Sequence, residues 1–97
     1  MIPVRFLSCA ENEFVQAVDY YNEQSPGLGF EFAAEVRRTL GRIQSHPSAW
    51  HALSARTRRC RVSRFPYGLI YQEREDHLLI VAVMHMSRRP EGWRERV

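Results

Sequence analysis

Two apolar stripes at helical spacing, joined by a Ser-Pro-Gly turn, constrain the fold of this chain most. Ser8 and Glu11 have the spacing of a capping box, which predicts that the first helix begins at Ser8. Pro26 and Gly27 end that helix and Pro47 ends the second, because proline cannot continue a helix. The pattern predicts an antiparallel helical hairpin whose stripe covers an apolar surface. The stripes consist of Ala10, Phe14, Val15, Val18 and Tyr21, and of Leu28, Phe32, Val36, Leu40 and Ile43.

Shorter segments with strand patterns supply that surface. Residues 78–84 are almost wholly apolar, which is typical of a strand that is buried on both faces and central in its sheet. Residues 47–56 have little pattern and are expected to form a loop, and the tail after residue 85 is polar. The order of elements is βααβββ, which predicts one α+β domain over residues 1–97, with the helical hairpin on one face of a small, mostly antiparallel sheet. Alternating strand patterns occupy residues 2–6, 59–64 and 67–72.

All 14 basic side chains are arginines, and they are unevenly distributed. Residues 1–55 hold four arginines and six acids, a balance of −2, whereas residues 56–97 hold ten arginines and five acids, a balance of +5. Codon bias is one explanation for the absence of lysine, but it does not explain this clustering. A basic stripe of this kind attracts polyanions or an acidic protein segment. The densest group comprises Arg56, Arg58, Arg59, Arg61 and Arg64.

Length and composition are those of a single folded domain, with 97 residues of which 44% are hydrophobic and 26% charged. No apolar run approaches the roughly 18 residues of a membrane span, and the first residues lack the pattern of a signal peptide. We therefore expect a cytoplasmic protein. Cys9 and Cys60 are far apart in the sequence and are expected to be reduced thiols, with a disulfide as the less favoured alternative.

The sequence lacks most standard catalytic motifs. It contains no GxSxG elbow, no glycine-rich phosphate loop and no HExxH. Glu11 and Glu13, like the acids of residues 73–76, are expected to be solvated charges on a helix and in a turn. His46 and His51 lie in a loop, and no third ligand has a recognisable spacing. Neither a metal site nor a cofactor is therefore predicted.

One set of side chains could bind an anion. The basic strand with Arg59 and Arg61 shares the predicted sheet with His85, which ends the apolar strand, and Arg88 follows. Guanidinium groups match phosphate and carboxylate bidentately, so their convergence at one edge predicts a site for such a group. Cleavage of RNA through its own 2′-hydroxyl needs a proton acceptor, and His85 is the nearby side chain that titrates near neutrality. The alternative is a structural role in which His85 packs beside Trp93.

Several stretches resemble the RelE/ParE toxin superfamily, and the resemblance covers nearly the whole chain. Residues 65–71 (FPYGLIY) and 82–93 (AVMHMSRRPEGW) resemble the C-terminal signature of the superfamily. Residues 20–21 (YY) and 25–32 (SPGLGFEF) resemble the helix-hairpin turn of its ParE-like branch. The resemblance implies a helical hairpin on an antiparallel sheet. It also implies a toxin of a type II toxin–antitoxin module, held inactive by an antitoxin encoded beside it.

The branch determines which activity the resemblance implies. RelE-like members cut messenger RNA on the ribosome, whereas ParE-like members poison DNA gyrase. The basic positions of the ribonuclease branch fall on Arg59, Arg61 and Arg88. The arginine that follows the strand tyrosine falls on Gly68, and the C-terminal tyrosine falls near residues 93–94, which are Trp and Arg. Two of the five ribonuclease positions are therefore not matched.

The resemblance thus implies a ParE-like toxin that arrests growth by binding a macromolecular target, with DNA gyrase as the leading candidate, and that is not itself an enzyme. The alternatives are a ribosome-dependent endoribonuclease and a degenerate, non-toxic member that only binds its antitoxin. The antitoxin is expected to be acidic and partly disordered, to fold along the hairpin and the sheet, and to form a hetero-oligomer with the toxin. Under the ribonuclease alternative, the catalytic residues would be Arg59, Arg61, His85 and Arg88. Residues expected to bind the target or the antitoxin are Arg58, Arg59, Arg61, Arg64, Arg88, Arg89 and Trp93.

Overall fold

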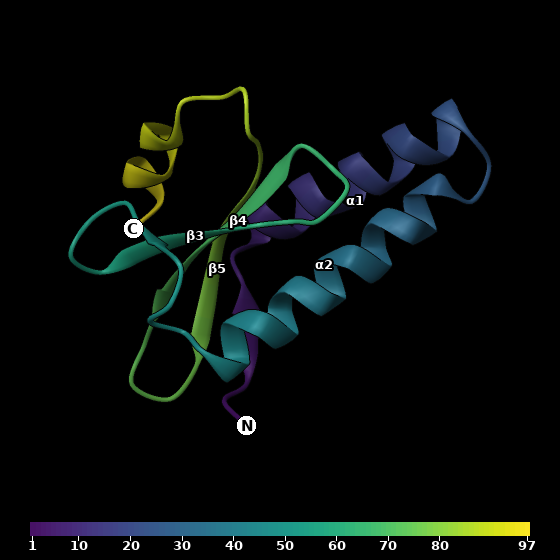
Figure 1. The fold of residues 1–97 in the computed structure, drawn as a ribbon. Helices are drawn as coiled ribbons and strands as arrows, with labels where there is room; N and C mark the ends of the chain where they lie inside the picture. Colours follow the sequence, from purple (N-terminus) through teal and green to yellow (C-terminus); the bar gives the residue numbers. More distant parts are fainter.

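The computed structural model describes the backbone of residues 1–97 and every side chain except that of Pro90. A helical hairpin lies on one side of a sheet, and a short C-terminal helix lies on the other side (Figure 1). The α+β architecture predicted from the sequence is confirmed. The elements are β1 (Val4–Phe6), α1 (Ser8–Gln24), α2 (Leu28–Ser45), β2 (His51–Ala52), β3 (Thr57–Arg61), β4 (Tyr67–Glu73), β5 (Leu78–His85) and the 3-10 helix η1 (Pro90–Arg96).

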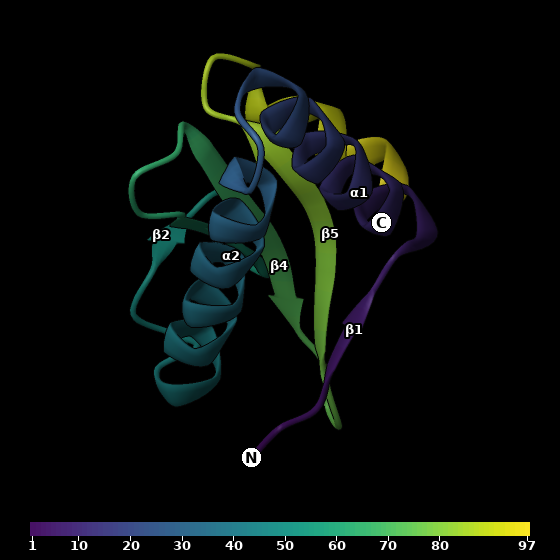
Figure 2. The ribbon, with the colours of Figure 1, turned by 90° about the vertical axis from the view of Figure 1, so that its right-hand side faces the viewer.

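The five strands form one mixed sheet in the order β1-β5-β4-β3-β2. β1 pairs with β5 in parallel, with Val4 opposite Leu78, and Figure 2 shows these two strands side by side. All other pairs are antiparallel. β5 is an interior strand, as its apolar run predicts, but the middle strand of the sheet is β4. The segment expected to be a loop contains β2, whose two residues pair with Arg58 and Arg59.

The helical hairpin begins and turns where the sequence predicts, but the capping box does not form. α1 begins at Ser8, and its N-cap residue, Leu7, makes no side-chain hydrogen bond. Gly27 provides the turn with a φ of 90°, a conformation that suits glycine. Next to it, the backbone N–H of Gly29 donates to Asn22 Oδ1 over 2.8 Å. The two helices therefore touch at the tip of the hairpin.

The face of the sheet beneath the hairpin carries the larger apolar core. Phe32 of α2 lies at its centre, with ring centroids 5.2 Å from Phe65 and 5.1 Å from Tyr67. Tyr21 of α1 packs edge-on against Phe65 at 4.9 Å. Edge-to-face aromatic pairs of this kind add about 0.5–1.5 kcal/mol to the gain from burial. The predicted stripes therefore cover the sheet, except at Val15, which is 50% exposed.

The opposite face of the sheet carries a second, smaller core that the sequence does not predict. Trp93 of η1 packs there with Ile70, Val81, Ala82 and Met84 and is only 5% exposed. The tail after β5 is therefore not merely polar, because η1 presents one large aromatic side chain to the sheet.

An ion pair ties the C-terminal helix to α1. The Arg96 guanidinium binds both carboxylate oxygens of Glu13, at 2.8 and 2.9 Å, and also donates to the Val81 carbonyl at 3.0 Å. Glu13 in turn accepts the backbone N–H of Val83 at 3.1 Å. The expectation that Glu13 is a solvated charge is therefore wrong. β1 pairs with β5 only over Leu78–Ile80, so this ion pair supplies partners for the next stretch of the β5 edge.

Candidate functional site

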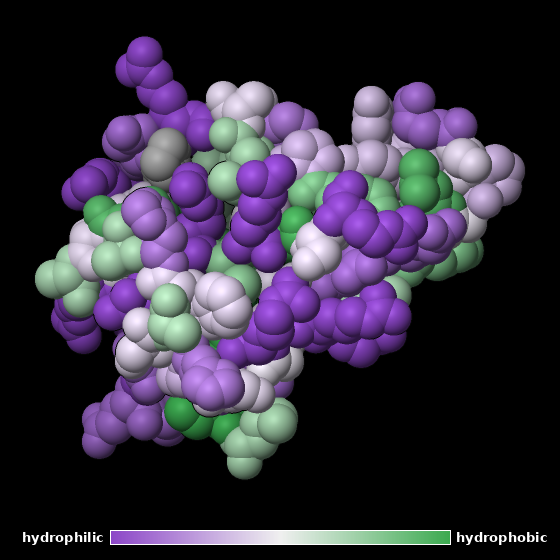
Figure 3. Space-filling model, in the orientation of Figure 1, coloured by the Kyte–Doolittle hydropathy of each residue, from purple (hydrophilic) through white to green (hydrophobic). Residues whose placement is uncertain are grey.

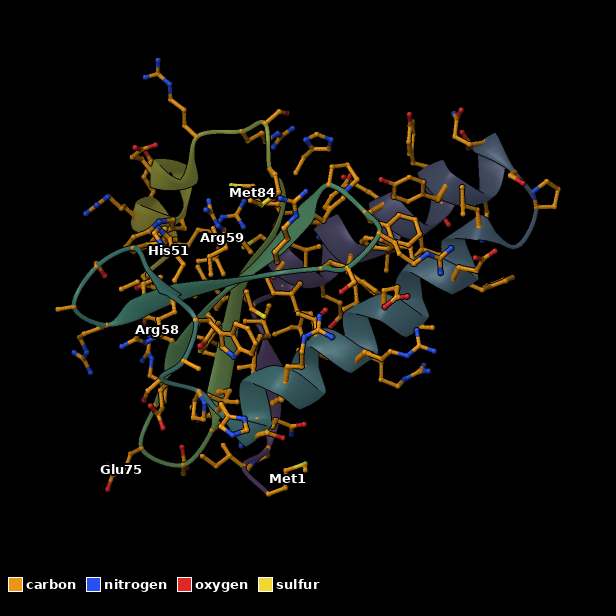
Figure 4. The ribbon with its side chains drawn as sticks, viewed as in Figure 1. Met1, His51, Arg58, Arg59, Glu75 and Met84 are labelled. Carbon is orange, nitrogen blue, oxygen red and sulfur yellow. The ribbon has the colours of Figure 1, made fainter. Side chains whose placement is uncertain are left out.

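Two of the predicted arginines, Arg59 and Arg61, lie on the face of the sheet opposite the hairpin. They alternate with Cys60, which is buried in the core beneath the hairpin. Their partners on β4 are Ile70 and Gly68, and Ile70 belongs to the second core. Figure 4 shows Arg59 lying toward Met84, with Arg58 apart from it. The alternation predicted from the sequence therefore produces the basic face that was expected.

Gly68 provides the space through which Arg59 passes. A Cβ atom at position 68 would lie 3.0 Å from Arg59 Cγ, 3.1 Å from Arg59 Cδ and 3.1 Å from Met86 Sδ. The aliphatic part of Arg59 therefore lies directly across this glycine. An arginine at position 68, as in the ribonuclease pattern, would need the volume that Arg59 and Met86 now fill.

Two other predicted arginines are bound within the chain and lie away from this face. The Arg58 guanidinium donates to the Trp50 carbonyl over 2.8 Å. Arg64, which has a φ of 72°, pairs with Glu31 at 2.8 Å and with Glu35 at 3.4 Å, both on α2. Neither therefore extends the surface formed by Arg59 and Arg61.

His85 and Arg88 are held together by a tight turn after β5. The Arg88 backbone N–H donates to the His85 carbonyl at 3.0 Å, and the Ser87 N–H donates to His85 Nδ1 at 3.1 Å. The aromatic ring beside His85 is Tyr67, its neighbour on β4, with ring centroids 5.3 Å apart. The structural interpretation that packed His85 beside Trp93 is therefore wrong about the partner.

Three of the four residues predicted for ribonuclease chemistry line one shallow hollow, which has no room for a water molecule. Arg59, His85 and Arg88 meet there beside Met84 and Met86. Arg61 follows two residues along β3 and is exposed, as is Arg89 in the turn. None of these four arginines forms an ion pair within the part of the chain that the structure describes. We refer to Arg59, Arg61, Arg88 and Arg89 as the arginine surface.

Trp93 is a core residue and not part of that surface. Its indole Nε1 is buried and has no hydrogen-bond partner among the described residues. Arg94 lies over the ring at 4.9 Å from the centroid. The structure therefore gives Trp93 a packing role, although the sequence favoured a place in a binding surface.

A polar pocket lies where α1 passes the end of β5. Its volume is about 230 Å³. We call it the α1–β5 pocket. Sequence reasoning missed this pocket because it expected Glu13 to be a solvated charge on the helix. Glu13 lies three residues after Ala10 and four before Ala17, both buried, and this spacing was the available signal that it faces inward. The lining of the α1–β5 pocket includes Glu13, Gln16, Tyr20, Tyr67, His85 and Arg88.

A separate apolar groove runs between the two helices and β1. Its volume is about 290 Å³, and its apolar walls are Phe6, Phe14, Val36 and Leu40. Glu11 and Arg37 lie at its rim.

Figure 3 shows hydrophilic groups over much of the sheet side of the molecule, with apolar groups toward the tip of the hairpin. Phe30, which is 71% exposed, belongs to that tip.

The thiols and ionisable groups give no sign of a metal centre. No group of three His, Cys, Asp or Glu side chains that could hold a metal ion occurs among the described residues. Cys9 and Cys60 are both free, and burial raises the pKa of the Cys60 thiol. Within the same part of the chain, neither helix has the length and apolar character needed to cross a membrane.

Known proteins match both the sequence and the fold. Residues 4–90 match the family model described as the ParE toxin of the type II toxin–antitoxin system parDE. Among solved structures, the chain is similar to one from the chromosomal ParDE toxin–antitoxin system of P. aeruginosa, with a TM-score of 0.75 and 12% sequence identity. That match covers 88% of this chain and 96% of the other. No curated protein matches the chain. The resemblance inferred from the sequence is confirmed.

Proposed function

The chain belongs to the ParE toxin family of type II toxin–antitoxin systems, and from this premise we propose that it arrests growth by binding DNA gyrase in the cytoplasm. The observation that carries the proposal is the arginine surface, in which four guanidinium groups are left without acidic partners among the described residues. Such a surface attracts an acidic protein or the phosphates of DNA, and a gyrase–DNA complex offers both.

The surroundings of Gly68 favour binding over RNA cleavage. Arg59 and Met86 lie too close to Gly68 to leave room for the arginine of the ribonuclease pattern. A binding surface requires only that its charges be exposed, whereas catalysis requires each group to be placed at the reacting phosphate. We therefore infer that the protein is not itself an enzyme.

The target is tested by inducible expression followed by parallel assays of DNA supercoiling and of transcript integrity. We expect supercoiling to fail while transcripts stay intact. Arg61→Ala and Arg88→Ala should each weaken growth arrest, because each removes one exposed charge from the arginine surface. Arg5→Ala is the matched control, since Arg5 is an exposed arginine on β1 and is far from that surface in the sheet.

The second candidate is a ribosome-dependent endoribonuclease, and the shallow hollow formed by Arg59, His85 and Arg88 favours it. His85→Ala distinguishes the two functions. A gyrase-binding toxin should tolerate this change, whereas a ribonuclease that uses His85 as its base should lose toxicity with its fold and antitoxin binding intact. Absence of growth arrest in the wild-type chain would support the third possibility, a non-toxic member that only binds its antitoxin.

Membership of the family implies a cognate antitoxin, and we propose that an amphipathic helix of that antitoxin occupies the apolar groove. Phe6, Phe14 and Leu40 offer apolar contacts to its anchors, and Arg37 at the rim offers an ion pair to its acids. Acidic residues further along the antitoxin would face Arg59 and Arg61. Arg64 contributes less than expected from the sequence, because Glu31 and Glu35 already bind it.

A further inference from the structure

The α1–β5 pocket has hydrogen-bond donors on three sides. Gln16 and Tyr20 come from α1, Tyr67 comes from β4, and His85 and Arg88 come from β5 and the turn that follows it. Arg88 belongs both to this pocket and to the arginine surface, because it lines the pocket and the shallow hollow beside Arg59. His85 also lines both hollows, whereas Gln16 and Tyr20 belong to α1 on the hairpin side of the sheet.

The turn after β5 fixes which ring nitrogen of His85 can donate to a ligand. Nδ1 accepts the Ser87 backbone N–H at 3.1 Å and lies 2.7 Å from Ser87 Oγ. An imidazole that accepts at Nδ1 carries its proton on Nε2 when neutral. His85 therefore has an Nε2–H donor, and it lines the same pocket as Arg88.

The Tyr67 hydroxyl adds a further donor. Burial raises the pKa of Tyr67, and the Arg88 guanidinium acts in the opposite direction, so the hydroxyl lies within the field of that arginine. With the pKa raised above 10, the hydroxyl keeps its proton at neutral pH and can donate it to an anion.

The carboxylate of the pocket is already neutralised. Both oxygens of Glu13 bind Arg96, and one of them also accepts the Val83 N–H. Arg88 has no acidic partner within the described part of the chain. The charge left uncompensated at the pocket is therefore positive.

We propose that the α1–β5 pocket binds a phosphate group, carried as inorganic phosphate or as the phosphate monoester of a nucleotide. A guanidinium binds two phosphate oxygens at once, and a third oxygen is left for His85 or Tyr67. Tyr20 is 54% exposed at the pocket, and its ring is a surface on which a nucleobase can stack. This site is additional to the proposed toxin function and does not depend on it.

The test is a titration of the full chain at constant ionic strength, followed by two-dimensional NMR and calorimetry. The probes are inorganic phosphate, adenosine 5′-monophosphate and adenosine. We expect saturable shifts at His85 and Arg88 with both phosphate probes, and none with adenosine. Tighter binding of the nucleotide than of phosphate would identify the monoester as the source, and equal affinities would identify the free ion.

Variants separate a built pocket from general attraction to a basic protein. Arg88→Ala should weaken phosphate binding about tenfold or more, because a charge-assisted bidentate contact is lost. Arg5→Ala removes the same charge elsewhere and should keep the wild-type affinity. Equal losses in the two variants, absence of saturation at millimolar phosphate, or equal affinity for acetate would each overturn the proposal. Circular dichroism confirms that each variant is folded.

Discussion

Two glycines of α2 have opposite surroundings, although both stand in a helical stretch of the sequence. A Cβ atom at Gly29 would lie 2.1 Å from the Val18 carbonyl oxygen, so α1 and α2 approach each other as closely as they do only because this side chain is absent. A Cβ atom at Gly41 would meet nothing within 4 Å. The same residue type therefore enables packing at one position and only weakens the helix at the other.

We expect Gly29→Ala to lower the free energy of unfolding by about 3 kcal/mol, because the obstacle is backbone and the helices must separate. The measurement is urea denaturation followed by circular dichroism. Gly41→Ala is the matched control and should raise stability by about 0.5–1 kcal/mol, since alanine favours a helix over glycine. Similar effects of the two changes would contradict the close approach at the hairpin tip.

The buried hydroxyl of Tyr71 should make the stability of the protein depend on pH in the alkaline range. Its hydroxyl donates to the Pro47 carbonyl, and burial raises the pKa of Tyr71 to about 12. The pKa of Tyr71 in the folded state lies above its value near 10 in the unfolded state. The contribution of Tyr71 to the free energy of unfolding is therefore complete below pH ~10 and is lost as the pH rises toward ~12. Unfolding free energies measured from pH 8 to 11.5 should therefore fall more steeply for the wild type than for Tyr71→Phe. Parallel curves would show that Tyr71 ionises as easily in the folded state as in the unfolded state.

At the scale of elements, long segments could be predicted from the sequence and short ones could not. α1 and α2 span 17 and 18 residues, long enough for an apolar stripe to repeat several times. β2 has two residues and therefore no period, and its formation depends on pairing with β3. η1 is held by one buried tryptophan and by Arg96, whose partner, Glu13, is 83 residues away in the sequence.

The residues of the candidate site also fall into those whose position could be predicted from the sequence and those whose position could not. Arg59 and Arg61 could be placed on one face because alternation along a strand is local. The pairing of Arg64 with α2 could not be foreseen, since Glu31 and Glu35 precede it by about 30 residues. The α1–β5 pocket likewise needs side chains from distant segments. Local periodicity indicates which face of an element a side chain occupies, but not which distant residue it contacts.

The ion pair between Glu13 and Arg96 should stabilise the C-terminal helix as a unit. Both side chains are mostly buried, so we expect Glu13→Ala and Arg96→Ala each to cost about 1–3 kcal/mol, partly by leaving backbone groups of β5 unpaired. A double-mutant cycle measured by urea denaturation should give a coupling energy of about 1–3 kcal/mol. Additive losses would indicate that the two side chains do not interact in solution.

For the whole molecule, the apolar groove and the arginine surface lie on opposite sides of the sheet. The groove uses β1 and the two helices, whereas Arg59 and Arg61 face away from the hairpin. Binding at the two surfaces should therefore respond differently to salt. Apolar contacts persist at high ionic strength, whereas exposed charges are screened beyond about 8–10 Å at physiological salt.

We expect Leu40→Ser to weaken antitoxin binding about tenfold at every salt concentration, because it removes apolar area from the groove. Arg61→Glu should weaken binding chiefly at low salt, where charge repulsion acts over a longer range. Calorimetry with the antitoxin segment at low and high salt measures both effects. If Arg61→Glu is silent at all salt concentrations, the arginine surface stays free for the target while the antitoxin is bound.

The position of β5 has a consequence for the order in which this protein can be made. β5 follows the other strands in the chain, yet it lies between β1, the first strand, and β4. Until β5 has left the ribosome, β1 has no neighbour and the apolar stripe of the hairpin has only part of the sheet to cover. β1 and the hairpin therefore cannot complete their packing before β5 is present. This slows folding and leaves apolar surface exposed until then. The growth arrest that we propose could therefore begin only after β5 has been synthesised, and the antitoxin groove, which includes Phe6 of β1, would be completed at the same point.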